Sequence, residues 1–147
     1  DSGYIALQVA LAGGCEEVLL PEREHDIVKM SEEIKAGNAM GKVSWIVIVA
    51  EGKARASVIA ETITEITGLE TREAVLGHIQ RGGRPTALDR ILASRLGSYA
   101  VDLFKDGKTG LCVHLENDLE AAFPLSKAIE PKKVDIEAQY RLIKLLT

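Results

Sequence analysis

The chain has 147 residues, of which 46% are hydrophobic and 27% charged, and its formal net charge is −4; this balance predicts a globular unit with a core of its own. Because it has no basic run and only 4% aromatic residues, the sequence argues against nucleic acid as a partner. The one long apolar stretch, around residues 5–14, is too short to cross a bilayer and lacks the order of a signal peptide, so we expect a cytoplasmic protein without a membrane partner.

The spacing of hydrophobic residues, and the positions of the glycines and prolines that end helices and strands, predict the secondary structure of the first half of the chain. These are a buried helix at 4–12, a strand at 17–20, a helix capped by Asp26 that runs to the Gly37 and Gly41 breaks, and a strand at 43–52. The segment 43–52 has continuous β-branched character. We therefore expect it to be a central strand that is covered on both faces.

The second half continues the alternation of helices and strands. We predict a helix at 53–67, a strand at 71–79, a helix opened by Pro85 and Thr86 with Asp89 at its capping-box position, a strand at 110–118 and a helix at 137–146. Such alternation predicts the α/β class, a layered βαβ arrangement with a mainly parallel sheet flanked by helices. We expect a single domain-like unit, 1–147, that is part of a longer polypeptide.

Glu51 stands where the strand at 43–52 should end, directly before Gly52. Ligand sites in parallel sheets collect at the carboxyl ends of the strands, so this carboxylate is a candidate ligand-binding group. It is equally well explained as the N-cap of the helix that follows.

The stretch LGHIQRGGRPT, residues 76–86, places a histidine and an arginine beside two glycines. His78 and Arg81 would offer donors that match phosphate oxygens. The amides of Gly82, Gly83 and the helix start near Thr86 would add positive potential. The residues favour a cradle for a phosphorylated small molecule over a loop of solvated charges.

Two further groups of residues are candidate binding residues, but their sequence patterns are less specific. Arg72 lies at the far end of the predicted strand, about 20 Å from the glycine turn, so it is either a surface charge or a contribution to a neighbouring subunit's site. Gly14 and Glu16, with Lys42 further along, either end a helix or shape a second anion and metal site. For this second group the residues alone favour the structural role.

The segments LGHIQRGGRPTALDRILASRLG, SGYIAL, AGGCE, IVIVAEG and TGLETR together resemble the carboxyl-terminal half of a 6-phosphofructokinase, closely over residues 1–115. The resemblance implies phosphoryl transfer to the 1-hydroxyl of fructose 6-phosphate in glycolysis. It implies that Glu51 binds sugar hydroxyls, that His78 and Arg81 bind the 6-phosphate, and that Arg72 serves the active site of a neighbouring subunit in a homotetramer.

The resemblance also implies what these residues do not supply. The glycine-rich nucleotide segment and the segment with the catalytic base and the Mg²⁺-binding aspartate belong to the amino-terminal half of the family, so we expect no catalytic residue and no turnover in this chain alone. The phosphoryl donor is either ATP or pyrophosphate, and family frequency favours ATP.

Bacterial members of this family bind a nucleotide diphosphate or phosphoenolpyruvate near the positions that match Gly14, Glu16 and Lys42, where Glu16 is also a candidate metal ligand. Here Met40 stands where a basic residue is expected, and Ser44 where histidine is common. Both changes remove side chains that could donate hydrogen bonds to the phosphate of an effector. We therefore hypothesise that the enzyme is weakly or differently regulated. Two alternatives remain open for the protein as a whole: a non-catalytic sensor of sugar phosphates or nucleotides, and a half that serves oligomerisation.

Overall fold

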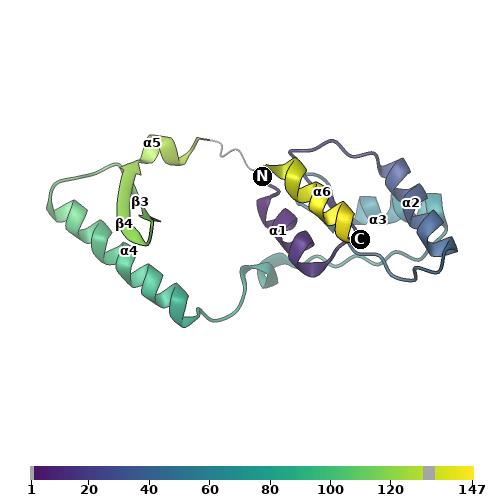
Figure 1. The fold of residues 1–147 in the computed structure, drawn as a ribbon, viewed down its shortest axis with the longest axis horizontal. Coiled ribbons are helices and arrows are strands. Elements are labelled where there is room, and N and C mark those ends of the chain that lie inside the picture. The colour runs from purple at the N-terminus through teal and green to yellow at the C-terminus, as the bar shows by residue number, and fades with distance from the viewer. Residues whose placement is uncertain (1, 131–134) are drawn as a thin grey trace. The chain divides into compact units, whose positions relative to one another are not determined.

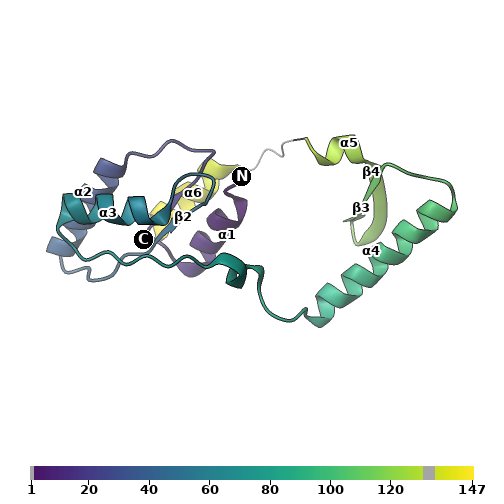
Figure 2. The same cartoon turned by 180° about the vertical axis from the view of Figure 1, so that it is seen from behind.

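The computed structural model describes residues 2–130 and 135–147. They form two compact units, of which the first extends to Leu76 and includes the C-terminal helix, and the second begins at Gly77. Nothing in the sequence pattern indicates this division. Figures 1 and 2 show the elements of each unit from opposite sides. No helix among the described residues combines the length and the apolar character that crossing a membrane requires.

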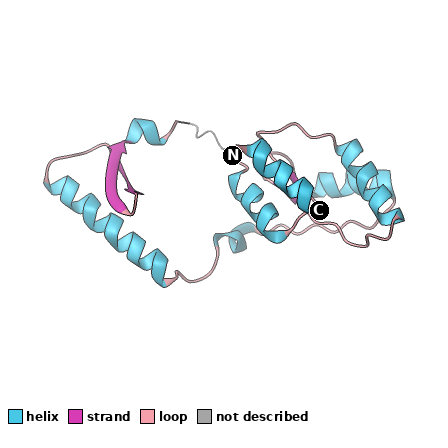
Figure 3. Ribbon diagram, viewed as in Figure 1, coloured by secondary structure: helices cyan, strands magenta, loops and turns pink. Residues whose placement is uncertain are grey.

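The first unit is an α/β unit built on two parallel strands. Its elements in chain order are α1 (Tyr4–Gly13), β1 (Glu17–Leu19), α2 (Ile27–Ala39), β2 (Val47–Val49), α3 (Ala56–Thr67) and α6 (Ile136–Leu146). Val18 of β1 lies opposite Ile48 of β2 in the parallel register. Helices and parallel strands confirm the predicted α/β class, and Figure 3 shows that helices make up most of the regular structure of this unit.

Successive residues of β1 enter two different cores, because side chains alternate between the faces of a strand. Val18 packs with Leu7 of α1 and Ile143 of α6 in a first cluster. Leu19 packs with α2 and α3 in a second cluster, which contains Met30, Ile34, Ile59 and Ile63. Helices therefore cover both faces of this small sheet, with α1 beside α6 and α2 beside α3 in both views (Figures 1 and 2).

The predicted central position of the strand over 43–52 is wrong for the described strands, but β2 is covered on both faces as predicted, because Ile48 packs against the first cluster and Val47 and Val49 against the second. All three residues of β1 are buried, whereas the three residues of β2 are only half-buried. Within the described residues β2 pairs with β1 alone. β-branched character over 43–52 thus predicted the strand but neither its length nor its place in the sheet.

The predicted strand at 71–79 is also wrong. Residues 69–76 have no regular secondary structure, and Gly77–Arg81 forms a short 3-10 helix, η1. Apolar alternation becomes a strand only where another strand pairs with it, and none of the described strands pairs with this segment.

The second unit contains η1, one long helix and a hairpin. After η1 its elements are α4 (Ala87–Lys105), β3 (Leu111–Glu116), β4 (Leu119–Pro124) and α5 (Leu125–Ala128). β3 confirms the strand predicted at 110–118, and it pairs antiparallel with β4, which the sequence analysis missed. Asn117 and Asp118 form the connection, both with positive φ (51° and 64°). Asparagine followed by aspartate between two apolar runs was the overlooked hairpin signal.

Candidate functional site

The 3-10 helix η1 carries the two residues predicted to bind a phosphate. His78 and Arg81 are both exposed and lie three positions apart in η1. In a 3-10 helix, side chains at positions i and i+3 eclipse one another. The backbone therefore presents the imidazole and the guanidinium on the same side of the helix.

Glycines bracket this short helix at both ends. Gly77 and Gly82 have φ values of +54° and +87°, a backbone conformation that side-chain-bearing residues rarely adopt. The Gly82 N–H donates to the Ile79 carbonyl oxygen at 3.1 Å. The amide of Gly82 therefore closes the turn and does not add to the phosphate cradle as the sequence analysis expected.

The start of α4 is capped from within. Thr86 accepts from the Asp89 N–H at 3.2 Å, and the Asp89 carboxylate accepts from the Thr86 N–H at 2.8 Å, which completes the predicted capping box. The hydrogen bonds from Thr86 lower the pKa of Asp89, so this side chain carries a negative charge at the helix N-terminus. The expected positive potential of the helix start is thereby offset, and the cationic character of the turn comes from its side chains.

Glu51 is exposed and lies in a turn directly after β2. Hydrogen bonding between β2 and β1 continues up to this turn, because the Ala50 N–H donates to the Leu19 carbonyl oxygen at 2.9 Å. The N-cap of α3 is Arg55, so the alternative explanation of Glu51 as the helix cap is wrong. Glu51 is thus presented at the carboxyl end of a parallel strand, where ligand sites form in such sheets.

The predicted sugar-phosphate residues are divided between the units. Glu51 and Arg72 belong to the first unit, and the pair His78 and Arg81 to the second. Arg72 lies in the irregular segment before η1 and pairs with Glu70 at 2.9 Å, with the two side chains 85% and 75% exposed. Such a surface pair contributes little to stability, so Arg72 remains able to serve a partner. A shared pocket of Glu51, His78 and Arg81 stays a prediction, as does the role of Arg72 at a neighbouring subunit's site.

Two of the three predicted effector residues, Glu16 and Lys42, pair with each other in the first unit. Gly14 ends α1 in the left-handed conformation. Lys42 Nζ pairs with Glu16 Oε1 at 3.0 Å and lies 4.5 Å from the centroid of the Trp45 ring. Burial alone would raise the pKa of Glu16, yet the hydrogen bonds from the Ile46 N–H and Lys42 outweigh it and lower the pKa. Both charged groups are thus already partnered within the chain.

Metal-ligating side chains do not cluster in residues 2–130 and 135–147. No group of three or more histidine, cysteine, aspartate or glutamate side chains there could hold a metal ion. The described residues thus contain no preformed cluster of three such ligands, and the role of Glu16 as a metal ligand stays a prediction. A shallow groove on α3 is lined by the carboxylates of Glu61, Glu65 and Glu73, whose charge disfavours a phosphorylated ligand.

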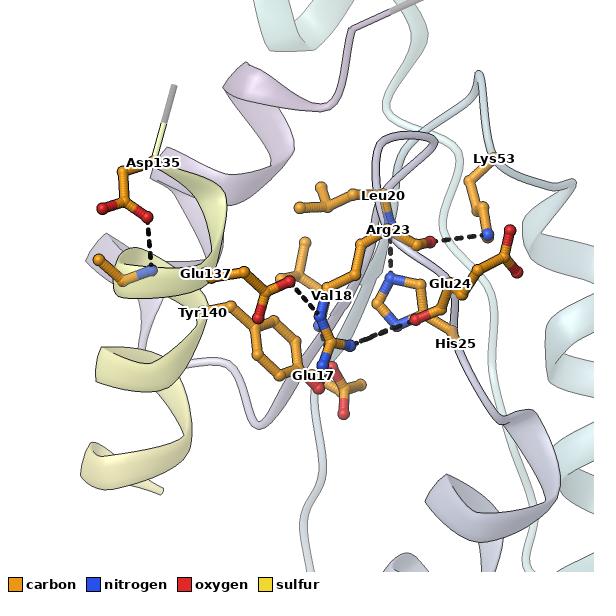
Figure 4. A network of polar contacts seen from close by, with 11 residues as sticks. Glu17, Val18, Leu20, Arg23, Glu24, His25, Lys53, Asp135, Glu137 and Tyr140 are labelled. Atoms are coloured by element: carbon orange, nitrogen blue, oxygen red, sulfur yellow. Dashed lines mark hydrogen bonds and ion pairs between the residues drawn. The ribbon is translucent and has the colours of Figure 1, made fainter. Parts of the chain in front are cut away.

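A buried polar network, which the sequence analysis missed, lies at β1 (Figure 4). Glu17 is 5% exposed, and its carboxylate accepts from the Tyr140 hydroxyl at 2.6 Å and pairs with Lys144 at 2.8 Å. Burial, followed by the hydrogen bond to Glu17, raises the pKa of Tyr140 well above its usual range. A glutamate within the predicted strand EVLL, residues 17–20, was the signal for this network, because buried carboxylates need partners.

Arg23 and His25 extend the network on the other side of the Tyr140 ring. The guanidinium of Arg23 lies 3.7 Å from the ring centroid and pairs with Glu137 at 3.1 Å. His25 Nε2 accepts from the Leu20 N–H at 3.1 Å. Burial, and then the charge of Arg23, lowers the pKa of His25. These contacts fasten α6 to the end of β1, as Figure 4 shows, and we assign them a structural role.

Comparison with known proteins places the chain in a family. The family model described as Phosphofructokinase matches residues 1–104. An ATP-dependent 6-phosphofructokinase from Bacillus licheniformis is 44% identical over 146 residues, which are 99% of this chain and 46% of that protein. One from Brevibacillus brevis is 44% identical over 148 residues, 100% of this chain and 46% of that protein. The chain therefore spans about half the length of the curated relatives that it matches.

Solved structures agree with this result. Pichia pastoris phosphofructokinase in the T-state matches with a TM-score of 0.69 and 26% identity over 99% of this chain and 17% of that chain. A pyrophosphate-dependent phosphofructokinase from Marinobacter aquaeolei matches in fold, with a TM-score of 0.75 and 24% identity over 92% of this chain and 40% of that chain. The family model covers well over half of the sequence, and on that ground the chain belongs to the phosphofructokinase family.

Proposed function

We propose that the protein to which this chain belongs transfers a phosphoryl group to the 1-hydroxyl of fructose 6-phosphate, and that this chain supplies the sugar-phosphate site. The observation that carries the proposal is the placement of His78 and Arg81 on one side of η1, exposed and bracketed by glycines. Relatives named ATP-dependent 6-phosphofructokinase at 44% identity support the same activity.

Each predicted residue has a role that its chemistry supports. The guanidinium of Arg81 offers a planar fork of donors to the 6-phosphate, and the imidazole of His78 adds a further donor. The carboxylate of Glu51 accepts hydrogen bonds from sugar hydroxyls. Arg72, whose surface pair with Glu70 is weak, reaches the active site of a neighbouring subunit.

The contribution of this chain is orientation. Phosphoryl transfer depends on positioning and on electrostatic stabilisation of the transferred group, and holding the sugar by its phosphate and hydroxyls fixes the 1-hydroxyl for attack. We propose ATP as donor because the relatives at 44% identity carry that name. Mg²⁺ would supply charge neutralisation, with its ligands in parts of the protein other than the residues described. This chain alone should therefore show no turnover.

The setting of the enzyme follows from the same proposal. We place it in glycolysis in the cytoplasm, as a homotetramer in which Arg72 crosses a subunit interface. Because Lys42 is engaged by Glu16 and Trp45, an effector phosphate would have to break an existing ion pair, so we propose weak or different allosteric control. Strong activation of the full-length enzyme by ADP would contradict that part of the proposal.

An NMR titration of this chain tests the sugar-phosphate site. Fructose 6-phosphate should give saturable shifts of the Glu51, His78 and Arg81 signals, and inorganic phosphate should leave Glu51 unmoved because it has no hydroxyls for that carboxylate to bind. Arg84, exposed in the same loop, is the internal control and should shift less than Arg81. Equal shifts with both ligands, or equal shifts of Arg81 and Arg84, would mean that these residues bind phosphate only through non-specific charge, and would contradict the proposed site.

A further inference from the structure

Glu51 and Gly52 are the central residues of a turn that the backbone closes. The Lys53 N–H donates to the Ala50 carbonyl oxygen at 2.8 Å, which is the hydrogen bond from the first to the fourth residue of a β-turn. The side chain of Glu51 is exposed, so packed neighbours do not fix its direction. The direction of this carboxylate therefore depends on how firmly the turn itself is held.

Both ends of this turn are fastened to the segment around the end of β1. At its first residue, the Ala50 N–H donates to the Leu19 carbonyl oxygen at 2.9 Å. At its last residue, Lys53 Nζ donates to the carbonyl oxygen of Arg23 at 2.8 Å, across 30 positions of sequence, as Figure 4 shows. The turn is thus held at its start by the sheet and at its end by the side chain of Lys53.

The carbonyl oxygen that accepts from Lys53 belongs to a braced loop. The Arg23 N–H donates to the Leu20 carbonyl oxygen at 3.3 Å, and the Leu20 N–H donates to His25 Nε2 at 3.1 Å. The guanidinium of Arg23 lies 3.7 Å from the centroid of the Tyr140 ring and pairs with Glu137 at 3.1 Å. Because the backbone and the side chain of Arg23 are both held, its carbonyl oxygen is a fixed point for the Lys53 tie.

The conformation of Lys53 is unusual for a lysine. Lysine side chains are mostly exposed and flexible, and ordering one costs rotamer entropy. Lys53 is nevertheless half-buried, and it donates to a backbone carbonyl oxygen. A hydrogen bond from a charged donor is stronger than one between neutral groups. This bond joins the loops at the carboxyl ends of β1 and β2, where ligands bind in parallel sheets.

We propose that Lys53 is a positioning residue of the sugar site, which ties residues 50–53 to the Arg23 carbonyl oxygen and so directs the Glu51 carboxylate toward the sugar hydroxyls. Lys53 does not touch the sugar in this role and acts only through Glu51. The inference rests on the proposed function, because it requires Glu51 to bind those hydroxyls. Lys53 follows directly after the segment IVIVAEG and was not among the residues that the sequence analysis singled out.

Binding of fructose 6-phosphate to the full-length enzyme tests the proposal. Lys53→Met keeps an unbranched stem and removes the donor, so the Kd should rise about fivefold, which corresponds to the net strength of one hydrogen bond. Lys53→Arg can still donate to the carbonyl oxygen, so its Kd should stay close to that of the wild type. Inorganic phosphate, which offers Glu51 no hydroxyl of a sugar, should bind Lys53→Met as tightly as the wild type.

A double-mutant cycle with Glu51→Gln tests whether Lys53 acts through Glu51. Glu51→Gln should raise the Kd for fructose 6-phosphate, and adding Lys53→Met to it should cause no further rise. A lysine that only stabilised the fold, or that only attracted the phosphate, would weaken binding equally in both backgrounds. Arg55→Met is the matched control, because it removes an exposed cation two positions further along the chain and should leave the Kd nearly unchanged.

Hydrogen exchange reports on the turn independently of activity. The amide at position 53 closes the turn, so it should be less protected in Lys53→Met than in the wild type or in Arg55→Met. If Glu51→Gln weakens sugar binding but Lys53→Met does not, or if the two effects add fully, the positioning role is wrong and the proposed function stands. If the wild-type enzyme does not bind fructose 6-phosphate, or if Glu51→Gln binds it as tightly as the wild type, the proposed sugar site fails and the positioning role fails with it.

Discussion

Removal of one hydroxyl group tests whether the buried network at β1 stabilises the first unit. The Tyr140→Phe substitution keeps the ring that packs against Arg23 and His25 and deletes only the donor to Glu17. Tyr140 is 8% and Glu17 5% exposed, so water cannot replace the lost hydrogen bond. The free energy of unfolding should therefore fall.

The magnitude follows from what Glu17 retains. A hydrogen bond to a charged acceptor contributes about 1.5–3 kcal/mol. The same carboxylate oxygen keeps the Val18 N–H at 3.0 Å, and the other oxygen keeps Lys144 at 2.8 Å, so the charge is not left without partners. We expect a loss of about 2 kcal/mol. With a urea m-value of about 2 kcal/mol per molar, the unfolding midpoint should fall by about 1 M.

Urea unfolding monitored by tryptophan fluorescence is the assay, because Trp45 is the sole tryptophan of the chain and packs against the second cluster of the first unit. Tyr4→Phe is the matched control, since Tyr4 is 51% exposed on α1 and its substitution should cost less than about 0.5 kcal/mol. If both variants unfold at the same urea concentration, the buried network contributes no net stability and the reasoning fails.

Three other substitutions test the site, a titrating group and a close contact. Arg81→Ala in the full-length enzyme should weaken fructose 6-phosphate binding by about 1.5–3 kcal/mol, measured as Kd, while Arg84→Ala should change it less; equal effects would argue against the phosphate assignment. Because burial lowers the pKa of His25 in the folded chain, the stability that neutral His25 contributes is fully present above about pH 6.5 and is lost as the pH falls through the folded-state pKa. Urea midpoints should therefore drop between about pH 7.5 and about pH 5.5, and His25→Gln should flatten that drop; an unchanged slope would assign it to other groups. Gly37→Ala should destabilise by about 1–3 kcal/mol and shift the fluorescence of Trp45, whose ring occupies the space that the added Cβ needs; a stabilised variant would contradict the packing.

Local signals in the sequence predicted local structure well. The helices α1, α2, α3 and α6 begin and end within a few residues of their predicted bounds, and α4 begins where it was predicted to begin, because caps such as Asp26 and Thr86 and the apolar period act over only a few residues. The capping box at Asp89 is present as expected. The α/β class followed from the same alternation of elements.

Pairing was harder to predict, because it depends on residues distant in the sequence. Residues 71–76 have strand-like alternation and no strand beside them among the described residues, whereas β4 forms because a two-residue turn returns it to β3. Burial of Glu17 depends on Tyr140, 123 positions away. The proximity of His78 to Arg81 was predicted, but for a strand-end turn and not for the 3-10 helix that aligns them.

The fastening of α6 to β1 has a consequence for biosynthesis. The residues that close the first cluster come from both sides of the second unit, as the contact between Gln8 and Gln139, 131 positions apart, illustrates. During synthesis, at about 5–20 residues per second, α1 leaves the ribosome several seconds before α6 exists. Leu7 and Ala10 can pack early against Val18 and Ala50 but lack Tyr140 and Ile143 for that interval, so the nascent chain leaves the α6 side of this cluster open to chaperones until the whole second unit has been translated.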